Sequence, residues 1–351
     1  IGNISGFRNQ TGVQNTYVGY ASGLGVTNNS HSTNTAVGYF TLKDVTTGGA
    51  NTVIGCFAGD AVTSQDSLTL IGKNAGGAIN NDGANGTVAV GASALMSMTS
   101  AAGNTAIGQE TMGVHTTGGK NVAIGHQVMY DTDAGSNSLG SSENVFIGFQ
   151  VASGTWTDSA CNHNVGIGND VMRGGLDGAN YNVALGSEAL MSLTTANGNI
   201  CLGYQSGTAI NTGVHNICIG YQAGSNIQSG RGSVCIGTGA APSSASVNEE
   251  IVISAGTDAV TGGGTETIRI GVDSDFVTLD FGGGGETWSH TSDERIKKEI
   301  NDTDIGLDFI NDLRPVTFKR KAPSEYPKSF DTYNETKTER NNPDKINYGF
   351  I

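Results

Sequence analysis

The first 241 residues repeat one short pattern of polar and apolar positions, Asn-x-x-aliphatic-Gly. Seven of the twelve spacings between successive motif glycines are seventeen residues, and the other five are longer by one to six residues. A fixed period of this kind is typical of stacked repeats, which bury their apolar faces against one another. The pattern therefore predicts a solenoid with a basic unit of seventeen residues. Its motif glycines are Gly19, Gly38, Gly55, Gly72, Gly91, Gly108, Gly125, Gly148, Gly168, Gly186, Gly203, Gly220 and Gly237.

The residue before each motif glycine is always a branched aliphatic, such as Ile107 or Ile124. We expect this position to face a continuous core, together with the Thr, Val or Ile two residues earlier. The residue between them, often Ala or Cys, points the opposite way because side chains alternate along a strand. Both faces are apolar, which predicts that both are covered. One can fill the interior of the chain while the other packs against partner chains.

Ten of the thirteen units carry Asn four residues before the glycine, as at Asn104 and Asn216. Stacked asparagines of this kind are expected to form a hydrogen-bonded ladder along the solenoid. The glycine suits a positive φ, or a place with no room for a Cβ atom. At about 4.8 Å per turn, thirteen turns would make a rod about 60 Å long.

The pattern changes after residue 241. Short strands are predicted at Ile251–Ile253, Ile268–Gly271 and Phe276–Phe281, followed by four consecutive glycines from Gly282. A helix is predicted after Asp302, with its end at Pro315, and a strand follows at Val316–Lys319. We predict a shaft over residues 1–241, a neck with a Gly-rich linker over 242–290, and a further domain over 291–351.

Composition and charge support this division. The chain holds 54 glycines and five prolines, and every proline lies at or after Pro242. Residues 1–290 hold seven Lys or Arg against 20 Asp or Glu, whereas residues 291–351 hold 11 against 12. So acidic a shaft argues against partners such as nucleic acid and anionic membrane surfaces. No apolar run is long enough for membrane insertion, and we expect further sequence before Ile1 and after Ile351.

No cofactor or metal is predicted. Cys201, Cys218 and Cys235 recur with the basic period of the repeat, at the position usually held by Ala, so they are expected to stack as core residues. Cys56 and Cys161 stand alone, without the spacing of metal ligands. A glycan-cleaving enzyme needs paired carboxylates, whereas the shaft's acidic residues are interpreted as solvated turn residues. They include Asp60, Asp82, Glu110, Asp170 and Glu188.

The repeats resemble a known family in segments such as 104–108 (Asn-Thr-Ala-Ile-Gly) and 182–190 (Asn-Val-Ala-Leu-Gly-Ser-Glu-Ala-Leu). These look like the head repeats of trimeric autotransporter adhesins, which form left-handed parallel β-rolls in trimers. The heads of that family use a shorter unit. The resemblance implies a homotrimer, a number that periodicity alone does not supply.

The last region resembles a second family. Residues 292–298 (Ser-Asp-Glu-Arg-Ile-Lys-Lys), the predicted helix and residues 313–318 (Leu-Arg-Pro-Val-Thr-Phe) look like the intramolecular chaperone of endosialidase-type phage tail spikes and fibres. The chain stops within that domain, at Ile351. The resemblance implies that the domain trimerises, guides folding of the fibre and then cuts itself away.

Carried over to this chain, the nucleophile would be Ser292 and its activating base Lys297. A serine needs a base to take its proton, and a lysine serves only if burial keeps it neutral. Such a Ser/Lys autoprotease would act once, without multiple turnover. The segment from Thr291 to Glu294 also fits a helix capping box, and both interpretations remain open.

The predicted fold class is therefore an all-β parallel β-solenoid shaft, packed as a homotrimer, with the start of an α+β chaperone domain. The predicted function is a viral or phage tail fibre or spike, located in the virion and extracellular, that binds other virion proteins and a glycan or protein receptor on the host surface. Alternatives are a cellular trimeric adhesin, or a tail-spike depolymerase whose catalytic domain lies outside this chain. The longest insertions, Asp131–Ser142 and Gly154–Asn162, are predicted receptor-binding loops, and the aromatic residues Tyr130 and Trp156 belong to these insertions.

Overall fold

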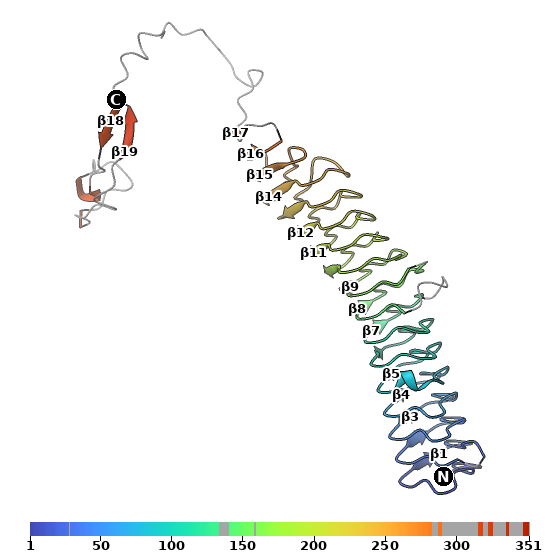
Figure 1. The fold of residues 1–351 in the computed structure, drawn as a ribbon. Helices are drawn as coiled ribbons and strands as arrows, with labels where there is room; N and C mark the ends of the chain where they lie inside the picture. Colours follow the sequence, from blue (N-terminus) through green and yellow to red (C-terminus); the bar gives the residue numbers. More distant parts are fainter. Residues whose placement is uncertain are drawn as a thin grey trace. The chain divides into compact units, whose positions relative to one another are not determined.

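The computed structural model describes residues 1–27, 29–132, 140–157, 159–282, 287–289, 315–318, 322–325, 335–336 and 347–350. It divides into two compact units, Ile1–Thr291 and Ser292–Ile351. The first unit is an elongated stack of coils, each contributing one strand to a sheet that runs along the stack (Figure 1). The described part of the chain is all-β apart from short 3₁₀ turns, which confirms the predicted parallel β-solenoid.

Seventeen strands form the sheet of the first unit, and each pairs with the next along the chain. Strands β1 to β15 are parallel, whereas β15, β16 and β17 pair antiparallel. They are β1 Thr16–Val18, β2 Thr35–Val37, β3 Thr52–Ile54, β4 Thr69–Ile71, β5 Val88–Val90, β6 Thr105–Ile107, β7 Val122–His126, β8 Val145–Phe149, β9 Val165–Asn169, β10 Val183–Leu185, β11 Ile200–Leu202, β12 Ile217–Ile219, β13 Val234–Ile236, β14 Ile251–Ala255, β15 Thr267–Val272, β16 Asp275–Asp280 and β17 Thr287–Ser289. A 3₁₀ turn, η1 (Asp82–Ala84), lies between β4 and β5.

The motif glycines stack directly on one another in successive coils. Gly125 has φ of 134°, and a Cβ atom built there would collide with the carbonyl of Gly148 in the next coil. Both expected reasons for glycine therefore apply at this position. The close approach is what brings the parallel strands into register, with Ile124 beside Ile147 and Gly125 beside Gly148.

The interior of the solenoid is filled by the second residue of strands β2 to β14, such as Ala106, Ala123 or Cys218, all fully buried. The prediction that the aliphatic residue before the glycine faces this interior was wrong. Ile107 and Leu185 point outward, with 37% and 47% of their surface exposed. Small side chains occupy this strand position in most coils, and the larger residues found there include Val53, Leu70 and Phe146. Larger apolar residues such as Leu190 enter from the opposite wall.

The predicted asparagine ladder is confirmed. From Asn104 to Asn216, each side-chain oxygen accepts the backbone N–H of the ladder residue in the next coil at 3.0 Å. Each Nδ2 donates to a turn carbonyl of the next coil, for example that of Asn164 to Ala179 O at 2.8 Å. The ladder thus satisfies buried polar groups that a coil without regular helix or hairpin would leave unpaired.

The parallel stack continues beyond the repeats through β14 and β15. At β14 the ladder position is held by Glu250, which is fully buried and accepts the backbone N–H of Ser243 at 2.8 Å and of Gly264 at 2.7 Å. In the second unit, β18 (Pro315–Phe318) pairs antiparallel with β19 (Asn347–Phe350), and η3 (Pro323–Glu325) lies between them in the chain. The helix predicted after Asp302 lies outside the described residues.

Candidate functional site

The outer face of the parallel strands carries a row of aliphatic side chains that runs the length of the repeats. Two residues of each strand point outward, the Thr, Val or Ile at its start and the aliphatic residue before the glycine. Within one chain these side chains are only partly covered, as Ile219 (36% exposed) and Ile200 (38%) show. We call this set of outward strand residues the outer strand face. A continuous apolar strip of this kind is typical of an interaction surface.

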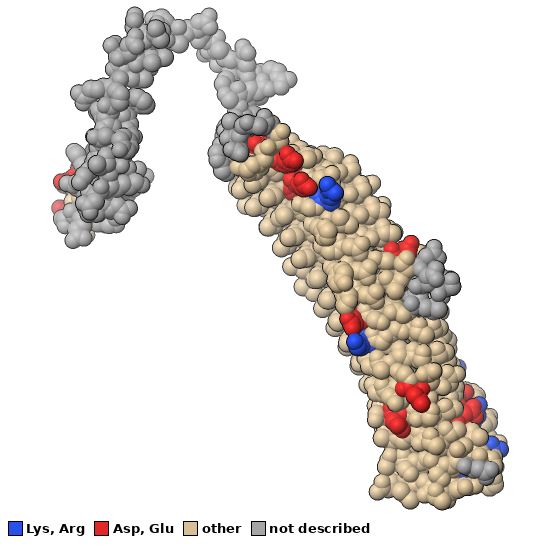
Figure 2. Space-filling model, in the orientation of Figure 1, with Lys and Arg blue, Asp and Glu red and all other residues tan. Residues whose placement is uncertain are grey.

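Charged side chains are sparse and scattered on the side of the shaft that Figure 2 shows. Lys43 and Asp44 form one local pair, at 3.0 Å, and Arg173 and Asp170 form another, at 3.1 Å. Each of these two pairs combines charges of opposite sign. In the part of the chain that the structure describes, no helix is long and apolar enough to cross a membrane.

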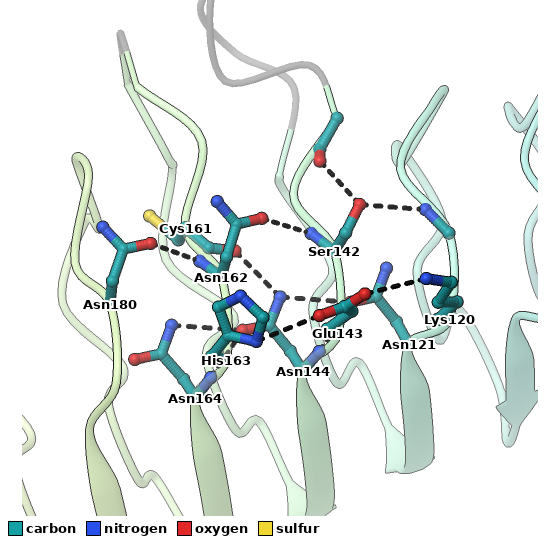
Figure 3. A network of polar contacts seen from close by, with 12 residues as sticks. Lys120, Asn121, Ser142, Glu143, Asn144, Cys161, Asn162, His163, Asn164 and Asn180 are labelled. Atoms are coloured by element: carbon teal, nitrogen blue, oxygen red, sulfur yellow. Dashed lines mark hydrogen bonds and ion pairs between the residues drawn. The ribbon is translucent and has the colours of Figure 1, made fainter.

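A line of four polar and aromatic side chains from consecutive coils runs along the shaft, and Figure 3 shows three of them, Lys120, Glu143 and His163. Lys120 Nζ donates to Glu143 Oε1 at 2.9 Å, and the other carboxylate oxygen of Glu143 lies 3.1 Å from His163 Nδ1. The imidazole of His163 stacks on the ring of Tyr181, with 5.0 Å between ring centroids. The hydrogen bond from Lys120 lowers the pKa of the Glu143 carboxyl below its ordinary value and raises that of Lys120.

Sequence reasoning missed this line, although a signal for it exists. Each of the four residues stands immediately before a motif asparagine, in four consecutive coils. All four adopt left-handed φ angles near 60°, which turn the chain at an outer corner. This position repeats in register, so the side chains that occupy it in neighbouring coils are in contact. The glutamate lies between the lysine and the histidine and can accept hydrogen bonds from both.

The two long insertions differ in how their aromatic residues are placed. Trp156 is fully buried, its Nε1 donates to Ala152 O at 3.1 Å, and its ring meets Phe146 edge-on. Phe146 occupies the strand position usually held by Ala, and Gly166 beneath it leaves room for the ring. Trp156 is therefore a core residue, and receptor binding by the two insertions stays a prediction. Tyr130 is partly exposed, and residues 133–139 and 158 lie outside the described residues.

The cysteines confirm the predicted core stacking. Cys201, Cys218 and Cys235 are fully buried, free and side by side in β11, β12 and β13. A hydrogen bond between neighbouring thiols, together with burial, raises the pKa of Cys218 and Cys235, so both stay protonated. Within the described ranges, no group of three or more His, Cys, Asp or Glu side chains could hold a metal ion.

Four of the five shaft carboxylates named above take part in separate contacts. Glu110 and Glu188 accept hydrogen bonds from Gln127 and Gln205 of the next coil, at 2.8 and 2.7 Å. Asp170 pairs with Arg173, and Asp82 accepts a hydrogen bond from Ser64. These partners come mostly from neighbouring turns, so the acidic residues support the stacking of coils.

The predicted catalytic pair, Ser292 and Lys297, lies outside the described residues, and its geometry stays a prediction. Comparison with protein families gives direct evidence for the surrounding domain: the family described as chaperone of endosialidase matches residues 292–351. No curated protein and no solved structure matches the chain. A β-solenoid shaft followed by a chaperone-of-endosialidase domain fits a protein of the tail fibre or tail spike type.

Proposed function

We propose that this chain is the subunit of a trimeric viral or phage fibre that attaches to a host surface, and that its C-terminal domain guides assembly. The observation that carries the proposal is the outer strand face, an apolar strip that a single chain leaves exposed, directly ahead of a domain that matches an assembly chaperone. Packing three such faces about an axis would remove them from water, at a gain of about 25 cal/mol for each Å² buried.

The chaperone and the shaft have a physical reason to occur together. Paired strands of successive coils are separated in the sequence by at least one full coil. Contacts between chains additionally require separate molecules to meet. Such assembly is slow and leaves strand edges exposed while it is incomplete. A domain that brings three chains into register would shorten that phase. Its later removal would leave a fibre that is stable because unfolding is slow.

Release is proposed to occur by cleavage at Ser292, with Lys297 as the base. The test uses the chain extended through a complete chaperone domain. We expect two bands on a denaturing gel and a trimeric mass by light scattering. Ser292→Ala should give one band, as should Lys297→Ala, whereas Lys298→Ala serves as the matched control and should still be cleaved.

Two results would contradict the proposal separately. If Ser292→Ala were still cleaved, Ser292 would not be the nucleophile. The capping-box interpretation of this segment would then be the one that remains. A folded monomer of the complete chain in light scattering would contradict the proposed trimer. Virion location and host attachment need a third measurement, the adhesion of the purified fibre to bacterial and eukaryotic cells.

A further inference from the structure

A groove of about 490 Å³ crosses the turns that precede strands β5 to β8. Its lining comes from four consecutive coils, and the polar residues in it are Asn81, Ser100, Thr117, Lys120, Ser142 and Glu143. These residues lie on turns, whereas the outer strand face lies on the strands. The groove and the surface assigned to the trimer are therefore made of different residues.

The spacing of the repeats explains why the groove forms at the coils of β5 to β8. The interval from Gly72 to Gly91 is two residues longer than the basic unit, the next two intervals equal it, and the interval from Gly125 to Gly148 is six residues longer. The first long turn carries η1, which places Asn81 and Gly83 on one side of the groove. The second long turn places its last residues on the other side. Two short turns between them form the floor.

Small residues and polar groups make up this surface. The floor includes Ala101, Ala102, Gly118 and Gly119, which leave backbone and Cβ atoms at the surface, and no large aliphatic or aromatic side chain is among the residues that line it. The other polar residues of the lining are Asn81, Ser100, Thr117 and Ser142. The hydroxyl of Ser142 donates to Gly140 O at 2.7 Å and accepts the backbone N–H of Gly119 at 3.1 Å.

The charges in the groove favour an uncharged ligand. Lys120 is the one basic residue among those lining it, and Glu143 lies 2.9 Å away. The pair offers hydrogen-bond donors and acceptors with no net charge. A nucleic acid requires a positive surface, and a peptide partner is normally anchored by large side chains in apolar pockets. A ligand that presents many hydroxyl groups fits this lining better than either.

We propose that this groove binds a short segment of an uncharged saccharide, with Lys120, Glu143 and the surrounding hydroxyl groups as its hydrogen-bonding partners. The volume lies within the range of about 300–1,000 Å³ that is usual for small-ligand sites. The inference rests on the attachment function proposed above and names the class of receptor.

The test measures binding of defined neutral and sialylated oligosaccharides to the full fibre, first on an array and then by calorimetry with the tightest binder. Ala102→Trp fills the floor of the groove from an exposed position and should weaken binding at least tenfold. Thr212→Trp places the same side chain on an exposed turn of a regular coil and should leave the dissociation constant unchanged.

Charge is tested with a second matched pair. Lys120→Gln removes the ammonium group from the groove and should weaken binding about tenfold, the usual effect of losing a hydrogen bond to a charged group. Lys73→Gln makes the same change at an exposed position outside the groove, and its binding should equal that of the unmodified fibre. Circular dichroism and light scattering verify that each variant folds and assembles normally.

The outcomes separate this inference from the attachment function. A fibre that adheres to cells but binds no saccharide on the array overturns the groove inference alone, as does unchanged affinity in Ala102→Trp. A preference for sialylated over neutral saccharides, or binding of peptides in place of saccharides, also overturns it. Saccharide binding that Ala102→Trp abolishes supports the groove, and the absence of adhesion to any cell would then count against attachment only.

Discussion

Asn144 and Asn164 lie in successive coils, and the side-chain oxygen of Asn144 accepts two hydrogen bonds from Asn164. The backbone N–H of Asn164 donates at 3.0 Å and its Nδ2 at 3.1 Å. Both residues are fully buried. The side chain of Asn144 thus binds both the backbone and the side-chain amide of the next ladder residue. The same pair of contacts recurs along the ladder.

Replacing one member of the ladder should leave buried groups without partners. Asn164→Ala removes the acceptor of the Asn182 backbone N–H and the donor to Ala179 O. We expect the free energy of unfolding to fall by about 1–3 kcal/mol, the cost of an unsatisfied buried polar group. Urea unfolding measures the change. Asn169→Ala, at an exposed position, is the control; an equal loss there would contradict a special role for the ladder.

Two glycine substitutions separate backbone strain from collision. Gly86→Ala introduces a Cβ atom at φ of 74° with nothing within 4 Å, so the cost should be about 1 kcal/mol. Gly125→Ala adds a collision with the carbonyl of Gly148, and the loss should exceed about 4 kcal/mol. Thermal midpoints of the two variants test the difference. Equal midpoints would mean that the stack can separate locally without cost.

Tyr17 should make the shaft sensitive to alkaline pH. Burial raises the pKa of its phenol from 10.0 to about 12, and its hydroxyl lies 2.6 Å from His31 Nδ1. The folded state holds the phenol proton more tightly than the unfolded state does. The contribution of Tyr17 to the free energy of unfolding is therefore complete below pH 10. It is lost as the pH rises toward 12.

The measurement is an ultraviolet titration of the intact chain against Tyr17→Phe. The difference spectrum should show one phenol that ionises near pH 12, and Tyr17→Phe should lose less stability than the unmodified chain between pH 10 and 12. Tyr221→Phe, at a position 51% exposed, is the control. A difference spectrum centred on pH 10 would contradict the effect of burial.

A charge on the outer strand face should disturb assembly. Ile219→Lys places an ammonium group where the proposed trimer packs, and we expect light scattering to show monomers or aggregates in place of trimers. Ser229→Lys adds the same charge to an exposed turn and should assemble normally. Trimers of unchanged stability with Lys at position 219 would show that another surface joins the chains.

Trp156 should contribute to stability more than to recognition. Trp156→Ala opens a cavity beside Phe146, with an expected loss of about 3–5 kcal/mol. Tyr181→Ala, at a position 64% exposed, should change stability little. Calorimetric melting of the two variants compares them. A small loss at position 156 would imply that the insertion loop moves independently of the core.

The constant period and the recurrent motif were sufficient to predict the parallel solenoid, the asparagine ladder and the stacked cysteines. Each depends on residues that repeat in register, and in-register stacking brings identical positions together whatever the shape of the coil. The chaperone domain was located in another way, because residues 292–298 carry a recognisable motif. The roles of Ser292 and Lys297 stay predictions, since they depend on geometry outside the described residues.

The sequence by itself determined the repeat, the strand positions and the alternation of two apolar faces. Only the tertiary structure decided which face lies inside, because that depends on the side toward which the turns close each coil. The coil of β6 takes Ala106 inward and leaves Ile107 outside. The path of the turns likewise buried Trp156, aligned Lys120 with Glu143 and opened the groove between two long turns. These relationships join residues of different coils, and the length of each turn sets them.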